Sequence, residues 1–148
     1  MICAIIDSYL KIPNPLENIG EKSKVKSYLC QIFVFAYVWG LGGNLTEMSR
    51  EKFETYAREQ FDDHQDARLP PGADLYGVYM NEVERRLDPW AKILPTFTYK
   101  TETPFFEMLV PTSDTVRFGF VMERLVSVNY PVLFVGDTGT LLCNEALS

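Results

Sequence analysis

A short apolar run that ends in two closely spaced glycines constrains this chain more than any other stretch. The run is Val132-Leu-Phe-Val135, and Gly136-Asp-Thr-Gly-Thr140 follows it. An unbroken apolar run of this length predicts a strand buried on both faces of a parallel sheet. Glycines directly after such a strand are typical of a phosphate-binding loop, in which backbone N–H groups and a helix N-terminus face phosphate oxygens. A bare Gly-x-x-Gly turn is also common without any ligand, so the spacing alone leaves both interpretations open.

The residues after this turn do not complete a phosphate-binding loop. The full pattern continues with Gly, Lys and then Ser or Thr, whereas this chain has Leu141, Leu142 and Cys143. The missing lysine would meet the terminal phosphates, and the missing hydroxyl would bind magnesium. From the spacing of its residues alone, the sequence shows no finished enzyme site.

Charge and hydropathy exclude two classes of partner. The chain has 20 acidic and 14 basic residues, a net charge of −6, and its only basic cluster is Lys22 to Lys26. A nucleic-acid surface needs a larger basic patch. The most apolar stretch, Tyr28 to Leu41, is 14 residues long, which is too short to span a bilayer. We therefore expect neither nucleic acid nor a membrane as partner.

The cysteines and the single histidine give weak chemical signals. Cys3, Cys30 and Cys143 are far apart and lack metal-ligand spacing, which predicts a reducing compartment and buried or inert thiols. His64 lies in the acidic stretch Asp62 to Asp66, where an exposed loop is a simpler interpretation than a metal cluster. A Cys–His nucleophile pair would require one cysteine to meet His64. We predict no catalytic residue and no metal site.

The periodicity of the sequence predicts a mainly helical chain. Residues 1–10 fit a short apolar helix or a strand. A largely buried helix is expected from Ser23 to Trp39, ended by a left-handed glycine within Gly40–Gly43. A second helix is expected from Thr46 to Phe61 with one apolar stripe. A third should begin at Thr112 or Ser113 and end near Asn129. The two apolar stripes are Phe53, Tyr56, Ala57 and Phe61, and Val116, Phe120, Val121, Leu125 and Val128. The aromatics Phe33, Phe35, Tyr37 and Trp39 are expected in the core.

The strands are harder to place. Residues 74–94 fit either a short strand or one helical turn. Phe97 to Tyr99 and Phe105 to Val110 are separated by five residues, a connection that suits a loose hairpin. Together with the apolar run at 132–135, these segments predict an α+β fold, mainly helical.

Three segments together resemble the dynein heavy chain motor. Phe35-Ala-Tyr-Val-Trp-Gly-Leu-Gly-Gly-Asn-Leu45 with Ser49-Arg-Glu-Lys-Phe53 is similar to the part of its AAA+ ring just before the third module. Trp90 and Pro104 to Thr112 resemble the extension that follows. Asp114 to Thr140 resembles the helix, strand and Walker A entry of that third module. The resemblance covers roughly residues 28–140, and the axonemal branch is the more similar one.

The resemblance implies a domain order and a function. Residues 1–61 would be lid helices of the preceding module, residues 62–111 an extension with a small hairpin, and residues 112–148 the start of a P-loop domain. An ATP or ADP site with magnesium would place phosphates against Gly136, Asp137, Thr138, Gly139 and Thr140 in the intact family. The implied function is ATP-driven, minus-end-directed movement along microtubules in cilia or flagella. Implied partners are the rest of the motor ring, other dynein chains and microtubules.

The departure from the motif changes the expectation for this chain. Because Leu141, Leu142 and Cys143 replace the family's Gly-Lys-Thr or Gly-Lys-Ser, we expect no ATPase activity and no tightly bound nucleotide. The sequence reads as a piece of a longer chain whose last eight residues are off-pattern. Two alternatives stay open: a non-catalytic helical interaction module, and a degenerate nucleotide-binding domain.

Overall fold

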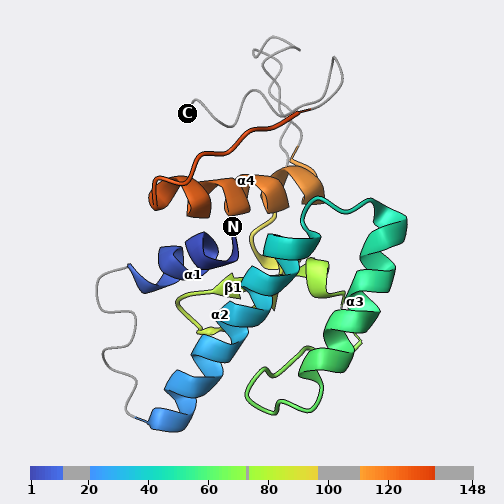
Figure 1. Cartoon of the computed structure of the whole chain (residues 1–148). Helices are drawn as coiled ribbons and strands as arrows, with labels where there is room; N and C mark the ends of the chain where they lie inside the picture. The colour runs from blue at the N-terminus through green and yellow to red at the C-terminus, as the bar shows by residue number, and fades with distance from the viewer. Residues whose placement is uncertain (12–20, 73, 97–110, 136–148) are drawn as a thin grey trace. The chain divides into compact units, whose positions relative to one another are not determined.

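The computed structural model describes residues 1–11, 21–72, 74–96 and 111–135 (Figure 1). The chain divides into two compact units, Met1–Pro89 and Trp90–Ser148. Four α-helices and one two-stranded antiparallel sheet account for the regular structure in the described ranges, apart from two single 3-10 turns. The predicted α+β, mainly helical fold class is confirmed.

The first unit is built around one long helix. α2 (Lys22–Gly42) buries side chains on nearly all sides, because its sequence is apolar on nearly all sides from Tyr28 onward. α1 (Ile2–Leu10) packs against it, and Tyr9 meets Phe35 edge to face with ring centroids 6.1 Å apart. The predicted burial of α2 is confirmed, and residues 1–10 adopt the helical one of their two expected conformations.

Two expectations for α2 are wrong. The helix does not stop at Gly40: it continues through Gly42, and Gly43 caps it with right-handed dihedrals (φ −60°, ψ −31°). Glycine is required at position 42 by close packing and not by a left-handed backbone conformation, because a Cβ on Gly42 would lie 2.0 Å from the Tyr76 hydroxyl. Phe33 is also not a core residue, because 44% of it is exposed.

By length and composition, α2 is also the one helix in the described ranges that could cross a membrane. Within its most apolar window 56% of the residues are buried inside the structure. A core helix meets the same criterion, so this property does not identify a membrane span.

α3 (Glu47–Phe61) begins after Thr46, as the sequence predicts, and packs against α2 through aromatic rings. Tyr37 of α2 stacks on Phe53 at 5.7 Å and meets Phe61 edge to face at 5.3 Å. The predicted helical hairpin is thereby confirmed (Figure 1). Tyr56 is the exception in the stripe, with 52% of its surface exposed.

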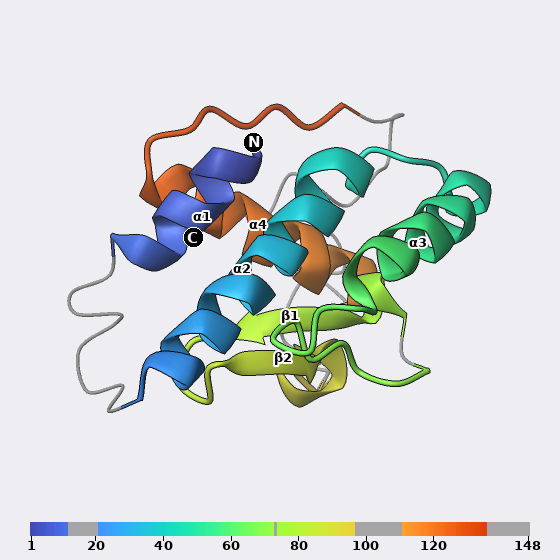
Figure 2. The ribbon, with the colours of Figure 1, turned by 60° about the horizontal axis from the view of Figure 1, so that its bottom comes forward.

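The sheet of the first unit is a hairpin that the sequence left undecided. The segment contains both of the structures that were expected as alternatives: a 3-10 turn at Leu75–Gly77 and then the strand β1 (Val78–Asn81). β1 pairs in antiparallel register with β2 (Arg86–Pro89), so that Met80 faces Leu87. Figure 2 shows α2 lying across this hairpin, with α1 and α3 on opposite sides of α2.

The second unit has one long helix among its described residues. α4 (Ser113–Ser127) begins with a reciprocal capping box, in which Thr112 and Thr115 each bond the other's backbone. It buries Val121 and Leu125 of the predicted stripe, whereas Val116, Phe120 and Val128 are half-buried. Phe120 meets Trp90 edge to face, with ring centroids 5.3 Å apart. Asn129, in the left-handed region at φ 59°, ends the helix as predicted.

The strand predicted at 132–135 does not form in this structure. Residues 131–135 have no ladder partner among the described residues. Leu133 and Val135 are 86% and 85% exposed, whereas Val132 and Phe134 are half-buried. An apolar run becomes a buried strand only when neighbouring strands accept its backbone hydrogen bonds. No described residue supplies such a neighbour to this run. The hairpin predicted at 97–99 and 105–110 lies outside the described residues.

Candidate functional site

The predicted phosphate-binding turn lies outside the described residues. The range 136–148 contains its residues Gly136, Asp137, Thr138, Gly139 and Thr140. It also contains Leu141 to Cys143, which differ from the phosphate-binding motif. The structure describes the approach to this turn, which is α4, the left-handed Asn129 and residues 131–135, which belong to no helix or strand. The nucleotide site therefore stays a prediction from the sequence.

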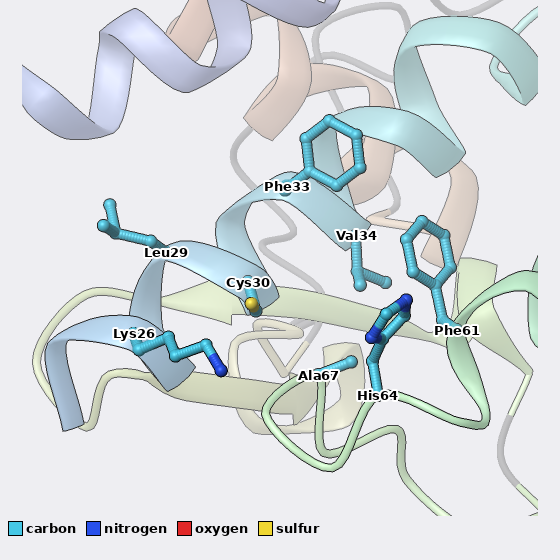
Figure 3. Close-up of a pocket in the computed structure, with 8 residues that line it drawn as sticks. All are labelled: Lys26, Leu29, Cys30, Phe33, Val34, Phe61, His64 and Ala67. Carbon is cyan, nitrogen blue, oxygen red and sulfur yellow. The ribbon is translucent and has the colours of Figure 1, made fainter. Parts of the chain in front are cut away.

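An apolar cavity in the first unit is the most site-like feature that the structure does describe. It has a volume of about 350 Å³ and lies between α2 and the loop that follows α3 (Figure 3). Its lining residues come from α2, from the last residue of α3 and from the segment that follows α3; they are Lys26, Leu29, Cys30, Phe33, Val34, Phe61, His64 and Ala67. Nothing in the sequence analysis predicted this cavity, because its walls come from two separate segments.

One lining residue of the cavity, Lys26, takes part in an ion pair. The Nζ atom of Lys26 lies 2.6 Å from the Oδ2 atom of Asp66. The hydrogen bond to this carboxylate, followed by its negative charge, raises the pKa of the Lys26 ammonium. Because both side chains are partly exposed, the pair contributes little to stability. The pair does mean that the positive charge of Lys26 beside the cavity is balanced by the negative charge of Asp66.

A buried polar chain holds the loop and the hairpin to α2. The side-chain amide of Gln31 donates to the Ser27 hydroxyl (3.1 Å), which in turn donates to the backbone carbonyl of Asp66 (2.9 Å). The side-chain oxygen of Gln31 accepts a hydrogen bond from the backbone N–H of Leu87 at 2.9 Å. Gln31 is 2% exposed. This one buried side chain therefore holds β2 to α2 directly and supports, through Ser27, the contact of α2 with the loop after α3.

The structure brings Cys30 and His64 to the same cavity. Cys30 lies on α2 and is half-buried, while His64 lies on the exposed loop that the sequence predicted. No hydrogen bond between the two side chains is present in the described ranges, so they do not form a nucleophile pair here. Cys3 is exposed, so of the expected buried or inert thiols it is not a buried one. Cys143 lies outside the described residues.

No metal centre is found within residues 1–11, 21–72, 74–96 and 111–135. These ranges contain no group of three His, Cys, Asp or Glu side chains that could hold a metal ion. The acidic residues near His64 are arranged around a solvent-exposed loop, with Asp62 and Asp63 exposed and Asp66 paired to Lys26.

Two family models match the chain in succession. Residues 1–92 match the dynein heavy chain AAA lid domain. Residues 97–141 match the P-loop containing dynein motor region. The two matches follow each other along the chain in the order that the resemblance in the sequence implies.

Individual relatives agree with these family matches. The human protein "Dynein axonemal heavy chain 6" is 49% identical over 138 residues, which are 93% of this chain and 3% of that protein. The mouse protein "Dynein axonemal heavy chain 2" is 33% identical over 143 residues, or 94% of this chain and 3% of that protein. The Chlamydomonas reinhardtii protein "Dynein-1-beta heavy chain, flagellar inner arm I1 complex" is 36% identical over 108 residues, or 72% of this chain and 2% of that protein.

The chain thus spans only about one thirtieth of the length of these relatives, since each match covers 2% or 3% of the longer protein. No solved structure matches the chain significantly.

Proposed function

The chain belongs to the dynein heavy chain family, and we propose that it is a non-catalytic segment of an axonemal dynein motor. The observation that carries the proposal is the succession of a lid match over residues 1–92 and a P-loop motor match over residues 97–141. In an intact heavy chain this stretch would join two AAA+ modules. It would serve ATP-driven, minus-end-directed movement along microtubules.

The proposed location is the axoneme of a cilium or flagellum. Relatives with the words axonemal or flagellar in their names support this location. The proposed partners are the remainder of the motor ring, other dynein chains and, through other parts of a heavy chain, microtubules. The proposed domain order stays as the sequence predicts it: lid helices to residue 61, an extension to residue 111, and the start of a P-loop domain after that.

A P-loop motor family uses ATP or ADP with magnesium, and the proposed contacts here are Gly136 to Thr140. This chain lacks the lysine and the hydroxyl that should follow them, because Leu142 and Cys143 hold those places. Without these groups the terminal phosphates and the magnesium ion lose their main side-chain ligands. We therefore propose no ATP hydrolysis by this chain and nucleotide affinity no tighter than about millimolar.

A phosphate-release assay on the purified 148-residue chain tests this proposal. Release in the presence of ATP and magnesium should equal that of a heat-killed sample. Turnover above that control would contradict the absence of catalysis. A matched variant, Leu141→Gly/Leu142→Lys/Cys143→Thr, restores the motif. ATP should then raise its melting temperature more than that of the unchanged chain, because only a ligand that prefers the folded state stabilises it.

A second candidate function is a helical interaction module that acts without nucleotide. The observation that favours it is the separate core of the first unit, where Ile32, Phe35 and Trp39 of α2 are at most 2% exposed. Such a module should be a stable monomer with one sharp thermal transition. A chain that is unfolded or aggregated by sedimentation and circular dichroism would exclude this alternative.

A further inference from the structure

We propose that the apolar cavity beside Cys30 is a binding site for a small, neutral, largely apolar molecule that carries one hydrogen-bonding group. This proposal concerns the first unit alone and does not depend on the motor function proposed above. Its size is the first argument: about 350 Å³ lies within the range of small-molecule sites, which begin near ~300 Å³.

The walls supply the second argument. Leu29 and Phe33 stand one turn apart on α2 at the cavity and remain 37% and 44% exposed. Val34 and Ala67 close the deeper side and are 2% exposed each. A molecule in the cavity would remove the exposed apolar surface of the first two residues from water, which favours an apolar ligand.

The charges beside the cavity select against a charged ligand. Lys26 and Asp66 neutralise each other at 2.6 Å. Asp62 and Asp63 are exposed on the same loop, so an anion would approach a locally acidic surface. A cation would lose its hydration inside the apolar walls, which is costly. A neutral ligand avoids both penalties.

His64 supplies a polar group that a ligand hydroxyl could bind. Its ring lies beside Val34 and Phe61 at the cavity (Figure 3). The backbone N–H of His64 bonds the carbonyl of Phe61 at 2.9 Å, but its imidazole makes no hydrogen bond to any residue within the described ranges. A neutral imidazole offers one donor and one acceptor, so a ligand hydroxyl placed among these side chains can be hydrogen-bonded.

The probe for the test is 1-naphthol, which has two fused apolar rings and one hydroxyl. The assay uses the full 148-residue chain with Cys3→Ser and Cys143→Ser, so that Cys30 is the one remaining thiol. Alkylation of Cys30 by iodoacetamide is followed by mass spectrometry. At saturation, 1-naphthol should slow the alkylation of Cys30 at least about threefold, because the thiol lines the same cavity.

Two variants and one matched ligand decide whether protection reports on this site. Ala67→Leu fills the cavity and should abolish the protection. His64→Leu changes an exposed side chain, so the fold should be retained, and it should weaken 1-naphthol binding between about twofold and tenfold, as the loss of one hydrogen bond does. 1-Naphthalenesulfonate, with the same rings and a negative charge, should protect less. Absence of protection by 1-naphthol, full protection in His64→Leu, or stronger protection by the sulfonate would each overturn the proposal.

Discussion

The phenolic hydroxyl of Tyr9 in α1 donates a hydrogen bond of 3.2 Å to the backbone carbonyl of Met80 in β1, 71 residues further along the chain. Met80 faces Leu87 across the hairpin, and the Leu87 N–H bonds Gln31 instead of β1. This pair is therefore a non-hydrogen-bonded one, whose backbone groups point away from the ladder. A side chain from α1 and one from α2 thus satisfy one group on each outer edge of the sheet.

This arrangement explains how a two-stranded sheet persists in the first unit. An isolated hairpin is at best marginally stable in water, and unpaired edge groups invite pairing with other chains. Tyr9 and Gln31 occupy such groups from within the same unit, and both side chains are buried (0% and 2% exposed). The helices therefore stabilise the sheet by hydrogen bonds as well as by apolar contact.

Tyr9→Phe should destabilise the first unit. Met80 is 0% exposed, so water cannot replace the lost hydroxyl, and an unsatisfied buried carbonyl costs about 1–3 kcal/mol. The ring contact with Phe35 is retained in this variant. Urea denaturation followed by circular dichroism measures the change in the free energy of unfolding. Tyr56→Phe, at a position 52% exposed, is the matched control and should change it by less than about 0.5 kcal/mol. Equal losses in the two variants would contradict the role of the Tyr9 hydroxyl.

Gln31→Leu should have a larger effect than a comparable change on the surface. The substitution keeps a similar volume but leaves the Leu87 N–H without its acceptor and removes the Ser27 contact. A loss of about 2–3 kcal/mol in the free energy of unfolding is expected. Gln60→Leu, at an exposed position of α3, is the control. A neutral or stabilising result for Gln31→Leu would show that the apolar gain outweighs both hydrogen bonds.

These two contacts also show why the sequence predicted the helices better than the sheet. α2 and α3 carry their signal locally, as an apolar run or stripe at helical spacing. β1 and β2 are four residues each, and their positions depend on Tyr9 and Gln31, which are remote in the sequence. A local signal for the turn between them did exist: the Asn81 side chain accepts from the N–H groups of Val83 and Glu84 at 3.0 and 3.1 Å. The turn was still not predicted, because it places Arg85 in the left-handed region at φ 55°, where a residue other than glycine is rarely expected.

The cavity and the apolar run at 132–135 were beyond sequence reasoning for different physical reasons. The cavity needs Cys30 and His64 to be neighbours, and only the packing of α2 against the segment after α3 makes them so. The apolar run has the composition of a buried strand, but composition does not specify a ladder partner. In the described part of the chain that partner is missing, and Leu133 and Val135 of the run are exposed.

Gly42→Ala should destabilise the chain even though alanine favours helices. An added Cβ would lie 2.0 Å from the Tyr76 hydroxyl and 2.7 Å from the Phe53 ring. Overpacking of this kind costs about 1–3 kcal/mol or more, which exceeds the gain of about 1 kcal/mol in helix propensity. The melting temperature should therefore fall. Lys52→Ala on the exposed face of α3 is the control, with a change close to zero. A raised melting temperature in Gly42→Ala would refute the close packing at this glycine.

Tyr76 should make the first unit lose stability at high pH. Burial is the main cause that raises the pKa of Tyr76 from 10.0 to about 12; the positive charge of Arg50 lowers this pKa, and the negative charges of Asp74 and Glu54 raise it. Its hydroxyl also donates to the backbone carbonyl of Gly42 at 3.1 Å, which requires the protonated form.

The sign of the effect follows from proton binding. Below pH 10 the phenol is protonated in both the folded and the unfolded chain, so its contribution to stability is fully present. Between pH 10 and about 12 the unfolded chain releases the proton while the folded chain retains it. The unfolded state then binds fewer protons than the folded state, and the free energy of unfolding falls as the pH rises. Chemical denaturation at intervals from pH 9 to pH 12 should show this decline.

The matched variant Tyr76→Phe separates this residue from the other groups that titrate in the same range. It lacks the ionisable hydroxyl and keeps the edge-to-face contact with Trp39, whose ring centroid lies 5.8 Å from that of Tyr76. The variant should be less stable than the unchanged chain at pH 9, because the hydrogen bond to Gly42 is lost. Its stability should also decline less steeply above pH 10, so that the two curves converge toward pH 12. Parallel curves would mean that the Tyr76 phenol ionises equally readily in the folded and unfolded chains, which would contradict a pKa raised by burial.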